Sequence, residues 1–514
     1  MPVCGLGHTM FETELKFQVP IAERERLLRA VATSTARSIP LRALYFDTPD
    51  RRLARAGLAL RLRKEGPQWV QTLKGQGASA LDRIEHELRL DAVRGEPRLD
   101  TSRHAGTPLA QPLANALGDA AGSLAVVFET DVLRTLRLVR HEGALVEVAF
   151  DSGVVIAGAN RLPLCEIEFE LKRGPVQGLL GLAARWAQRH RLWLDVRSKA
   201  EQGDRLARGV AAGPAVQAVA PKLTQDMSGD SALRCIVGAC LAQVLKNAAD
   251  VAGGVGGPEH LHQLRVGLRR LRCALRVFGS ASNAVDSRWE PALAALFTEL
   301  GIARDRDVLA ESSLPELRRA GAPLVDLMPE PDNSDPGEAL RAAPVSSLLL
   351  ELIGFAHAAT HPGDPQTDLR PPDFPSLVKL QLRRIRRQLR ADAAGFVTGD
   401  DEQRHRARKR LKRLRYSLEF VAGLYRGRSL KHCLARVRAA QEVLGRYNDL
   451  VVAERAFRVQ LERDPRAWFA IGWLTAQREQ RVPQAAKALA DVAKVARVLR
   501  RRGQRAETRA ERAA

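Results

Sequence analysis

Acidic and basic residues alternate with other residues along a short segment near the start of the chain, Glu12-Thr13-Glu14-Leu15-Lys16. Because alternate side chains of a β-strand point to opposite faces, Glu12, Glu14 and Lys16 would share one face. Burying two carboxylates about 7 Å apart beside an ammonium is costly unless an ionic ligand satisfies them. A divalent cation together with a phosphate chain would satisfy both signs. Taken alone, the segment also fits an edge strand whose polar face meets water.

A second acidic segment, at residues 161–172, has the same alternation. Three carboxylates and an ammonium would share one face of this strand: Glu166, Glu168, Glu170 and Lys172. Two such strands in one sheet would repel each other, and a metal ion between them would remove the repulsion. The two segments together therefore favour a metal site over two solvated edges.

The residues between these segments read as short strands separated by turns. Strand-like alternation covers residues 42–48, 58–65, 68–74, 83–90, 126–139, 144–151 and 154–157, and helical spacing covers 21–33. Turn residues at 49–50, 66–67 and 151–153 divide the strands. The pattern predicts an antiparallel sheet of many strands, either open or closed into a barrel.

Charged residues fall repeatedly on one face of these predicted strands. The sets that share a face are Arg61 with Arg63, Arg83 with Glu85 and Glu87, and Glu147 with Asp151. A barrel that turned these faces inward would have a charged interior, suited to Mg²⁺ or Mn²⁺ with a phosphate chain. Each residue alone fits a solvated face equally well, but their recurrence favours the interior.

Seven short pieces of residues 9–208 resemble, in order, the CYTH family, also known as the triphosphate tunnel metalloenzymes. The pieces are Glu12 to Lys16, Tyr45 to Thr48, Leu60 to Arg63, Thr72 to Gly75, Arg83 to Glu87, Cys165 to Glu170, and Ser198 with Lys199. The resemblance implies an antiparallel eight-stranded β-tunnel that binds a linear triphosphate and one or two divalent ions, Mg²⁺ or Mn²⁺. It implies metal-dependent hydrolysis of inorganic triphosphate. Thiamine triphosphate hydrolysis and ATP cyclisation are alternatives on the same fold, but the chain offers no convincing aromatic set to bind their rings.

The same resemblance assigns roles to individual residues. It implies metal ligands at Glu12, Glu14 and Asp151, with Glu168 opposite and either Glu170 or Glu166 beside it. It implies that phosphate oxygens are held through charge-assisted hydrogen bonds by Lys16, Arg61, Arg63, Lys74, Arg134 and Lys199. Lys16 would also act in catalysis, and Glu85 or Glu87 would orient the attacking water.

The second half of the chain differs in composition and is more basic. Residues 209–230 have no consistent period and several Gly and Pro residues, so we expect a linker there. Residues 231–500 have 3.6-residue spacing, which predicts a helical domain, and 501–514 read as a disordered basic tail. Of the net charge of +22, residues 1–213 carry +6 (31 Lys and Arg against 25 Asp and Glu) and the remainder carries +16. This charge favours polyanionic partners.

An internal duplication places two basic helices in the second half. Residues 262–278 and 405–421 align at a histidine, and positions 0, +3, +7 and +10 of each fall on one helical face. These positions are His262, Arg265, Arg269 and Arg272 in one copy and His405, Arg408, Lys412 and Arg415 in the other. A third basic stretch contains Lys379, Arg383 and Arg386. Because like charges on one face repel, two such faces indicate a cleft for a polyanion rather than a solvated surface.

The duplicated segments resemble the CHAD family, the conserved-histidine α-helical domain that often follows a CYTH domain. The matching pieces are His262 and Arg265 with Arg269, Arg270 and Arg272; Ala303 to Asp307; His405 with Arg408, Lys409, Lys412, Arg413 and Arg415; and Leu444-Gly445 with Asn448-Asp449. The resemblance implies two pseudo-symmetric four-helix bundles that bind inorganic polyphosphate. It departs at residues 321–375, where a Pro- and Asp-containing insertion around Met328 reads as a loop. Metal binding by the histidines is a weaker alternative, because Arg and Lys surround them.

Composition restricts the partners and the compartment. Aromatic residues make up 5% of the chain, which disfavours base stacking and hence a specific nucleic-acid partner. The six cysteines form no CxxC pair. No apolar run approaches the roughly 20 residues of a membrane span, and the best candidate is 345–359. We therefore expect a cytoplasmic protein, at polyphosphate granules if the helical domain binds that polymer. A non-catalytic polyphosphate adaptor is the alternative to an enzyme, and the oligomeric state stays open.

Overall fold

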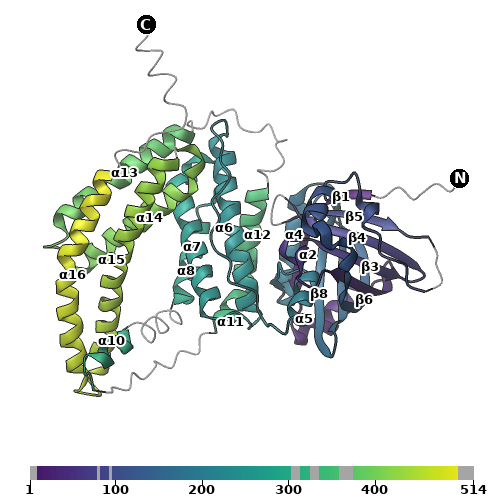
Figure 1. The fold of residues 1–514 in the computed structure, drawn as a ribbon, viewed down its shortest axis with the longest axis horizontal. Helices are drawn as coiled ribbons and strands as arrows, with labels where there is room; N and C mark the ends of the chain where they lie inside the picture. The colour runs from purple at the N-terminus through teal and green to yellow at the C-terminus, as the bar shows by residue number, and fades with distance from the viewer. Residues whose placement is uncertain are drawn as a thin grey trace, which may run out of the picture. The chain divides into compact units, whose positions relative to one another are not determined.

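The computed structural model describes residues 8–77, 81–91, 95–301, 313–323, 335–357, 374–425 and 427–495 (Figure 1). The matching piece Ala303 to Asp307, the Met328 part of the predicted loop and the predicted tail at 501–514 lie outside these residues. The chain divides into two compact units. The barrel unit comprises Met1–Val216, Val244–His260 and Gly337–Pro362, and the helical unit comprises Gln217–Gln243, Leu261–Pro336 and Gly363–Ala514.

Eight antiparallel strands form the barrel. They are β1 (His8–Gln18), β2 (Arg37–Asp47), β3 (Ala59–Glu65), β4 (Gln68–Gln76), β5 (Asp82–Arg89), β6 (Ala125–His141), β7 (Ala144–Ala157) and β8 (Asn160–Arg173). Their order is β5-β4-β3-β2-β6-β7-β8-β1, and β5 also pairs with β1, so the sheet closes. A short strand, β9 (Trp193–Leu194), pairs with the end of β1. The predicted eight-stranded antiparallel architecture is confirmed.

The two faces of the barrel differ in chemistry. On the outer face, Phe17 meets Phe169 edge-on, and Phe169 in turn contacts Trp186 of α4 (Val176–His190). Further short helices of this unit are α1 (Arg24–Val31), α2 (Arg52–Arg55) and α3 (Ala110–Leu117). The charged face is the interior, because side chains from strands that are not neighbours meet across it, such as Glu12 of β1 and Lys74 of β4.

Part of the interior is apolar and receives a helix, α5 (Lys199–Ala207). The rings of the cross-strand partners Tyr45 and Phe128 stack with centroids 4.4 Å apart and contribute to an apolar cluster against which α5 packs. Gly203 permits the close approach, since a Cβ there would lie 2.2 Å from the Phe128 ring. Lys199, the first residue of α5, contacts the charged part of the interior.

Strand β7 runs without a break through the turn that we predicted at residues 151–153. Asp151 pairs in register with Arg134 of β6 and with Glu166 of β8. Gly153 accounts for the misleading signal, because a Cβ there would lie 2.1 Å from the Asp131 carbonyl oxygen. Glycine within a strand often marks such a close backbone approach. The predicted turn is therefore wrong.

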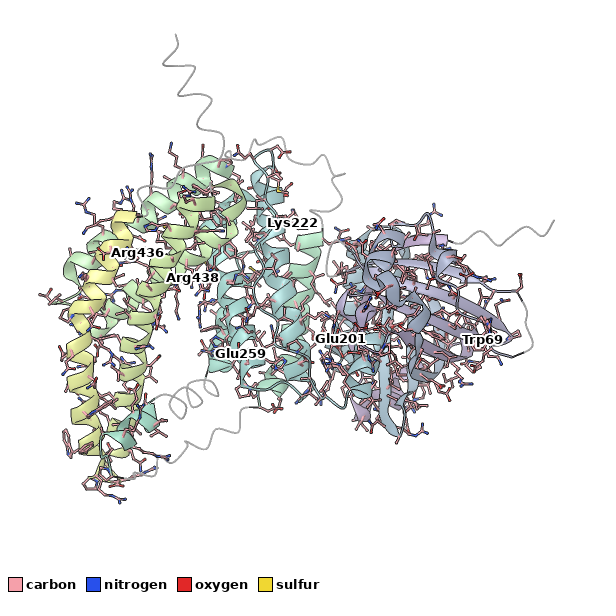
Figure 2. All side chains as sticks on the ribbon, viewed as in Figure 1. Trp69, Glu201, Lys222, Glu259, Arg436 and Arg438 are labelled. Atoms are coloured by element: carbon pink, nitrogen blue, oxygen red, sulfur yellow. The ribbon has the colours of Figure 1, made fainter. Side chains whose placement is uncertain are left out.

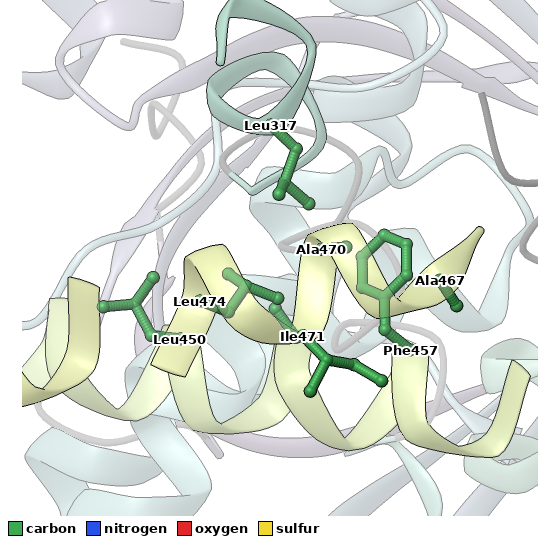
Figure 3. Close-up of a cluster of buried hydrophobic side chains, with 8 residues drawn as sticks. Leu317, Leu450, Phe457, Ala467, Ala470, Ile471 and Leu474 are labelled. Carbon is green, nitrogen blue, oxygen red and sulfur yellow. The ribbon is translucent and has the colours of Figure 1, made fainter. Parts of the chain in front are cut away.

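The helices after α5 are α6 (Gly229–Ala252), α7 (Pro258–Phe278), α8 (Trp289–Glu299), α10 (Leu314–Arg319), α11 (Pro336–Arg341), α12 (Ala343–His357), α13 (Phe374–Gly395), α14 (Asp401–Phe420), α15 (Gly427–Gln460) and α16 (Ala467–Val495). Helices α13 to α16 pack against one another as a bundle. Figure 3 shows an apolar cluster in which Leu317 of α10 packs with Phe457 of α15 and Ile471 of α16. The predicted fold class, a barrel followed by an all-helical region, is confirmed.

Two helices occupy part of the insertion that we predicted as a loop at residues 321–375. Both α11 and α12 lie within it, and α12 packs against α4 in the barrel unit. Gly354 of α12 lies directly against Leu180 of α4. The loop prediction is wrong for residues 336–357, because the Pro and Asp residues that prompted it flank a Leu-rich buried helix.

Helix α6 departs from the expectation that no apolar run reaches the length of a membrane span. It is long and apolar enough to cross a membrane by length and composition, and 72% of its most apolar 18-residue window is buried inside the protein. A mostly buried core helix meets the same criteria. We did not predict this apolar helix from the sequence, because charged residues such as Lys246 and Asp250 interrupt the run of apolar residues.

The close approach at Gly153 predicts a large effect of a small substitution. In Gly153→Ala the added methyl group would collide with the Asp131 carbonyl oxygen, so we expect a loss of about 2 kcal/mol or more in unfolding free energy. Urea unfolding measures it. Gly122→Ala is the matched control, since a Cβ at Gly122 meets nothing within 4 Å. Equal stability of the two variants would contradict this account of β7.

Candidate active site

One charged group in the barrel interior, the Lys199 cluster, joins three carboxylates to two cations. Lys199 Nζ lies 2.8 Å from Asp151 Oδ2, 2.5 Å from Glu166 Oε1 and 2.7 Å from Glu168 Oε1. Arg134 donates to both oxygens of Asp151, at 2.7 and 2.6 Å, and also contacts Glu168. Strands β6, β7 and β8 supply the cluster's other members side by side, and Lys199 comes from α5.

Burial and pairing act on the pKa values of the Lys199 cluster in opposite directions. Asp151 and Glu166 are fully buried. Burial raises the pKa of Glu166. Burial also opposes ionisation of Asp151 and Glu168, but Lys199 and Arg134 hold the pKa of both below the usual range. Burial would lower the pKa of Lys199, yet its three carboxylates raise it well above its usual value. The cluster therefore favours a charged lysine beside ionised Asp151 and Glu168, whereas burial favours the protonated form of Glu166.

Glu166 is the member of this cluster with unused hydrogen-bonding capacity. Lys16 Nζ lies 3.3 Å from Glu166 Oε2, and Lys199 lies close to Oε1. Neither oxygen has a hydrogen bond of regular geometry within the described part of the chain. One oxygen from each of Asp151, Glu166 and Glu168 lies within 4.8 Å of the others, which is close enough to hold one metal ion.

A second interior group, the Lys74 cluster, joins strands β1, β3, β4 and β5. Lys74 Nζ lies 3.1 Å from Glu12 Oε2 and 2.6 Å from Glu85 Oε2, and Arg61 lies 3.4 Å from Glu85 Oε1. Burial raises the pKa of Glu12 to about 8, helped by the neighbouring Glu85. Burial opposes ionisation of Glu85, but Lys74 and Arg61 hold its pKa far below the usual range. Glu12 therefore tends to keep a proton while Glu85 is ionised.

The other predicted acids of the barrel pair mainly outside these two clusters, although Glu87 also lies 3.7 Å from Arg61 of the Lys74 cluster. Glu87 contacts Arg63 at 3.1 Å and accepts from Thr72 at 3.2 Å. Glu14 lies 3.5 Å from Arg83. Glu170 lies 2.6 Å from Lys172, which also approaches Glu147 at 3.8 Å. The structure thus groups Glu168 with Glu166 and Asp151, and it places Glu170, Glu12 and Glu14 in other ion pairs.

Thr72 and Tyr45 also bind charged side chains of the interior. No role was predicted for either residue from the sequence. The Tyr45 hydroxyl accepts from Arg61 at 3.3 Å. Tyr45, Arg61, Thr72 and Glu87 lie directly opposite one another on the neighbouring strands β2, β3, β4 and β5. All four side chains therefore share one face of the sheet. Both residues lie within the matching pieces, but their contacts depend on strand register, which the sequence did not supply.

In the helical unit, the basic faces of α7 and α14 meet around Lys412. Burial lowers the pKa of Lys412 well below its usual value, and Arg269, Arg408 and Arg265 lower it further against the opposing effect of Asp449. The four cations Arg265, Arg269, Arg408 and Lys412 are called the basic cluster. The two duplicated helices therefore bring cations at matching positions, Arg265 with Arg408 and Arg269 with Lys412, near one another.

Side chains of the helical unit support the basic cluster on both helices. The guanidinium carbons of Arg265, Arg269 and Arg272 lie 4.4, 5.2 and 5.6 Å from the centroid of the Phe297 ring. His405 Nδ1 lies 3.1 Å from Asn448 Oδ1, and burial lowers the pKa of His405. His262 is half-buried on the same face of α7 as Arg265.

The remaining predicted polyphosphate residues lie apart from the basic cluster. Arg270 is 1% exposed and donates to Gln243 and to the Val219 carbonyl oxygen. Arg415 pairs with Glu419 and donates to Gln441. Burial lowers the pKa of Arg413, whose nearby cations include Arg276, Arg410 and Arg384. Exposed positions on α13 and α14 hold Lys379, Arg383 and Lys409, and Arg386 is half-exposed.

Family models account for both halves of the chain. The CYTH domain model matches residues 10–203, and the CHAD domain model matches residues 235–458. The chain is a CYTH domain followed by a CHAD domain. The Lys199 and Lys74 clusters belong to the CYTH domain, and the basic cluster belongs to the CHAD domain.

A curated relative matches part of the chain. An inorganic triphosphatase of Haemophilus influenzae is 35% identical over 162 residues, which is 31% of this chain and 44% of the relative. The match therefore spans less than half of that relative's length. Among solved structures, the CHAD domain from the plant Ricinus communis is 32% identical, with a TM-score of 0.48 over 57% of this chain and all of that one. A putative adenylyl cyclase from Hippeastrum with a dominant triphosphatase activity is 19% identical, with a TM-score of 0.29 over 38% of this chain and 96% of that one.

The raised pKa of Glu12 predicts a pH-dependent change in the stability of the CYTH domain. Its pKa is about 8 when folded, against an unfolded value of 4.5, so the folded chain keeps a proton that the unfolded chain releases between these values. The contribution of Glu12 to the stability of the wild-type chain therefore falls as pH rises through this window. Glu12→Gln removes the penalty, and its stability relative to the wild-type chain should rise by about 1 kcal/mol or more from about pH 5 to pH 8.

Urea unfolding across this pH range, with a chelator present, measures the Glu12→Gln effect. Glu25→Gln is the control, because its carboxylate is exposed on α1. A Glu12→Gln difference that stays constant across the range would show that Glu12 ionises normally in the folded chain.

Proposed function

We propose that the CYTH domain hydrolyses inorganic triphosphate with a divalent metal ion, and that the CHAD domain binds inorganic polyphosphate. The observation that carries the first part is the Lys199 cluster, in which Lys199 and Arg134 are buried against three carboxylates. Cations and carboxylates packed together match a ligand that has both signs, such as a phosphate chain with its metal ion. The partial identity to an inorganic triphosphatase supports the same substrate class.

The carboxylates of the Lys199 cluster fit a hard divalent cation. Carboxylate oxygens are the ligands that Mg²⁺ and Mn²⁺ prefer, and three of them converge here. Glu166 can take a ligand without breaking a regular hydrogen bond to the described residues. We assign Asp151, Glu166 and Glu168 as ligands, and Glu12, Glu14 and Glu170 as further acids that the family resemblance implies. The ion, Mg²⁺ or Mn²⁺, would neutralise charge that develops on phosphate oxygens.

The cations of the barrel would hold the phosphate chain itself. Lys16, Arg134 and Lys199 contact the Lys199 cluster, whereas Arg61 and Lys74 contact the Lys74 cluster and Arg63 lies beside Glu87. Each cation is already paired and oriented, so phosphate oxygens would replace or share carboxylate partners with little reordering.

The chemical step needs an oriented water molecule more than a strong base. Water adds to the terminal phosphorus while its bridging P–O bond breaks, which yields phosphate and pyrophosphate. Glu85 is suited to accept a hydrogen bond from that water, because its low pKa keeps it ionised. Glu87 is the second candidate, since it lies on the same strand two residues away.

Hydrolysis of tripolyphosphate tests the first part of the proposal. We expect phosphate release in the presence of Mg²⁺ or Mn²⁺, and its loss in the double variant Glu12→Ala with Glu14→Ala and in Glu168→Ala. Glu25→Ala, on the exposed face of α1, should keep wild-type activity. Thiamine triphosphate and ATP, assayed in parallel, distinguish the organic substrates. No release from any of the three by the wild-type chain would favour the non-catalytic adaptor, and full activity of Glu168→Ala would overturn the metal assignment.

The basic cluster carries the proposal for the CHAD domain. Burial lowers the pKa of Lys412, and Arg269, Arg408 and Arg265 lower it further against the opposing effect of Asp449, so these cations repel the charged form of Lys412. A polyanion would remove this repulsion, and a flexible polyphosphate chain can follow cations that are spread over two helices. We leave Arg270 out of this site because its guanidinium is buried and already donates to Gln243 and to the Val219 carbonyl oxygen.

Charge reversal at the basic cluster tests polyphosphate binding. In the full chain with chelator present, Arg269→Glu with Lys412→Glu should weaken binding of long-chain polyphosphate by well over tenfold, since each lost charge-assisted contact contributes about 1.5 to 3 kcal/mol. The matched control, Arg436→Glu with Arg463→Glu, makes the same charge change at exposed residues; Figure 2 labels Arg436 on α15. Calorimetry at several salt concentrations measures the affinity, which should fall steeply with salt. Equal loss in both double variants, or equal affinity for duplex DNA, would mean that only the net charge acts.

The same proposal places the protein in the cytoplasm at polyphosphate granules. A fluorescently tagged chain should colocalise with stained polyphosphate, and the Arg269→Glu with Lys412→Glu variant should disperse. A wild-type distribution of that variant would contradict this localisation.

A further inference from the structure

Part of helix α6 belongs to the barrel unit, although the family model assigns α6 almost wholly to the CHAD domain. Residues Val244–His260 group with the barrel unit, and α6 ends at Ala252 within that range. Asp250, near the end of α6, is 3% exposed. A carboxylate buried this deeply needs charged or hydrogen-bonding partners. Its partners identify what this end of α6 does.

Asp250 forms ion pairs with two arginines of the barrel unit. Arg205 Nη1 lies 2.5 Å from Asp250 Oδ1, and Arg205 Nη2 lies 3.2 Å from Asp250 Oδ2, so the pair is bidentate. Arg197 Nη1 lies 3.4 Å from Asp250 Oδ1. Bidentate arginine–carboxylate pairs fix orientation as well as supply energy. Asp250 therefore holds two defined points of the barrel unit.

These two arginines flank Lys199 in the chain. Arg197 precedes Lys199 by two residues, and Arg205 follows it on α5, the helix that begins at Lys199. Asp195 also binds Arg197, at 2.9 Å, and the Asp195 backbone N–H donates to the Lys16 carbonyl oxygen of β1. The ion pairs of Asp250 with Arg197 and Arg205 therefore connect α6 to both sides of Lys199 in the chain.

A second ion pair between α6 and α5 also holds α5 in place. Lys246 of α6 lies 2.7 Å from Glu201 Oε2, and Glu201 Oε1 lies 2.7 Å from Arg205. Glu201 is labelled in Figure 2. On its other side, α5 packs against Phe128 through Gly203, so the helix is held between the barrel and α6. Without α6, α5 would keep its contacts within the barrel, such as Gly203 against Phe128 and Asp204 with Arg51 at 3.3 Å, but it would lose the ion pairs with Asp250 and Lys246.

We propose that Asp250 is a positioning residue for the triphosphate site: through Arg197 and Arg205 it fixes α5 so that Lys199 Nζ meets Asp151, Glu166 and Glu168. This inference rests on the proposed function only for the role of Lys199 in binding the phosphate chain. That Asp250 positions Lys199 does not depend on the proposed function. A CYTH fragment that ended at the linker would lack this support.

Chemical labelling of Lys199 tests the placement without any assay of activity. In the full wild-type chain, Lys199 is only 13% exposed and is shielded by three carboxylates, so an amine-reactive reagent should modify it slowly. In Asp250→Ala its labelling rate, followed by mass spectrometry, should rise by about fivefold or more relative to exposed Lys64, which serves as an internal reference. Asp250→Asn, which keeps the size and one acceptor oxygen, should give a smaller rise. Asp286→Ala, which removes a half-buried carboxylate of the helical unit, should give none.

A kinetic double-mutant cycle tests whether Asp250 acts through Lys199. Asp250→Ala should lower kcat/KM for tripolyphosphate by about tenfold or more, because small displacements of a binding group have large effects. In a Lys199→Met background the same change should cost less than about twofold, since its route to the substrate is gone. A general loss of folding would instead lower activity equally in both backgrounds.

The outcomes separate this inference from the proposed function. An inactive wild-type chain would refute the proposed function, and the labelling of Lys199 would still decide whether Asp250 positions it. Unchanged labelling in both Asp250 variants would overturn the inference. Additive losses in the cycle would also overturn it, since Asp250 would then act by a route other than Lys199.

Discussion

Closure of the barrel buries charges of both signs, and the arrangement of the CYTH site follows from the need to compensate them. Asp151 and Glu166 have no exposed surface, and a buried ion without a partner costs several kcal/mol. Lys199 and Arg134 meet this need on one side of the interior, and Lys74 and Arg61 meet it on the other. The same pairs that make closure tolerable also hold the cations in the positions where phosphate oxygens would find them.

The compensation depends on a residue outside the barrel strands. Strands β6, β7 and β8 contribute more carboxylates than cations to the Lys199 cluster, and the lysine comes from α5, after the last strand. The interior can therefore reach its native electrostatic balance only when α5 has docked against Phe128. Since α5 in turn binds Asp250 and Lys246, the site depends on chain well beyond residue 203, where the CYTH family model ends.

The strands and their charged faces could be predicted from the sequence, because alternation is a local property. The partners of each charge could not, because they depend on the stagger between strands. The choice between Glu166 and Glu170 illustrates this: both share one face, but the register pairs Glu166 with Asp151 and Glu170 with Glu147. Gly153 and helix α12 show the reverse case, in which a local turn or loop signal was overridden by packing against β6 and α4. The role of Asp250 could not be predicted from the sequence, because a single acid in an apolar helix only interrupts the apolar pattern.

The described residues of the CYTH and CHAD domains arrange their charges in opposite ways, and each arrangement suits the phosphate ligand that we propose for it. In the barrel, each cation contacts at least one carboxylate, so the interior is close to balanced and a bare anion would have to displace an acid from its partner. On the proposed function, an anion that arrived with a divalent cation would avoid this cost, because the carboxylates would hold the metal while the lysines and arginines held the phosphate oxygens. In the CHAD domain, burial and three neighbouring arginines depress the pKa of Lys412, and Asp449 only partly offsets them. A bare polyanion would relieve that repulsion directly. On the proposed function, metal would therefore be needed in the barrel and not in the helices, as a consequence of where the described part of the chain places its acids.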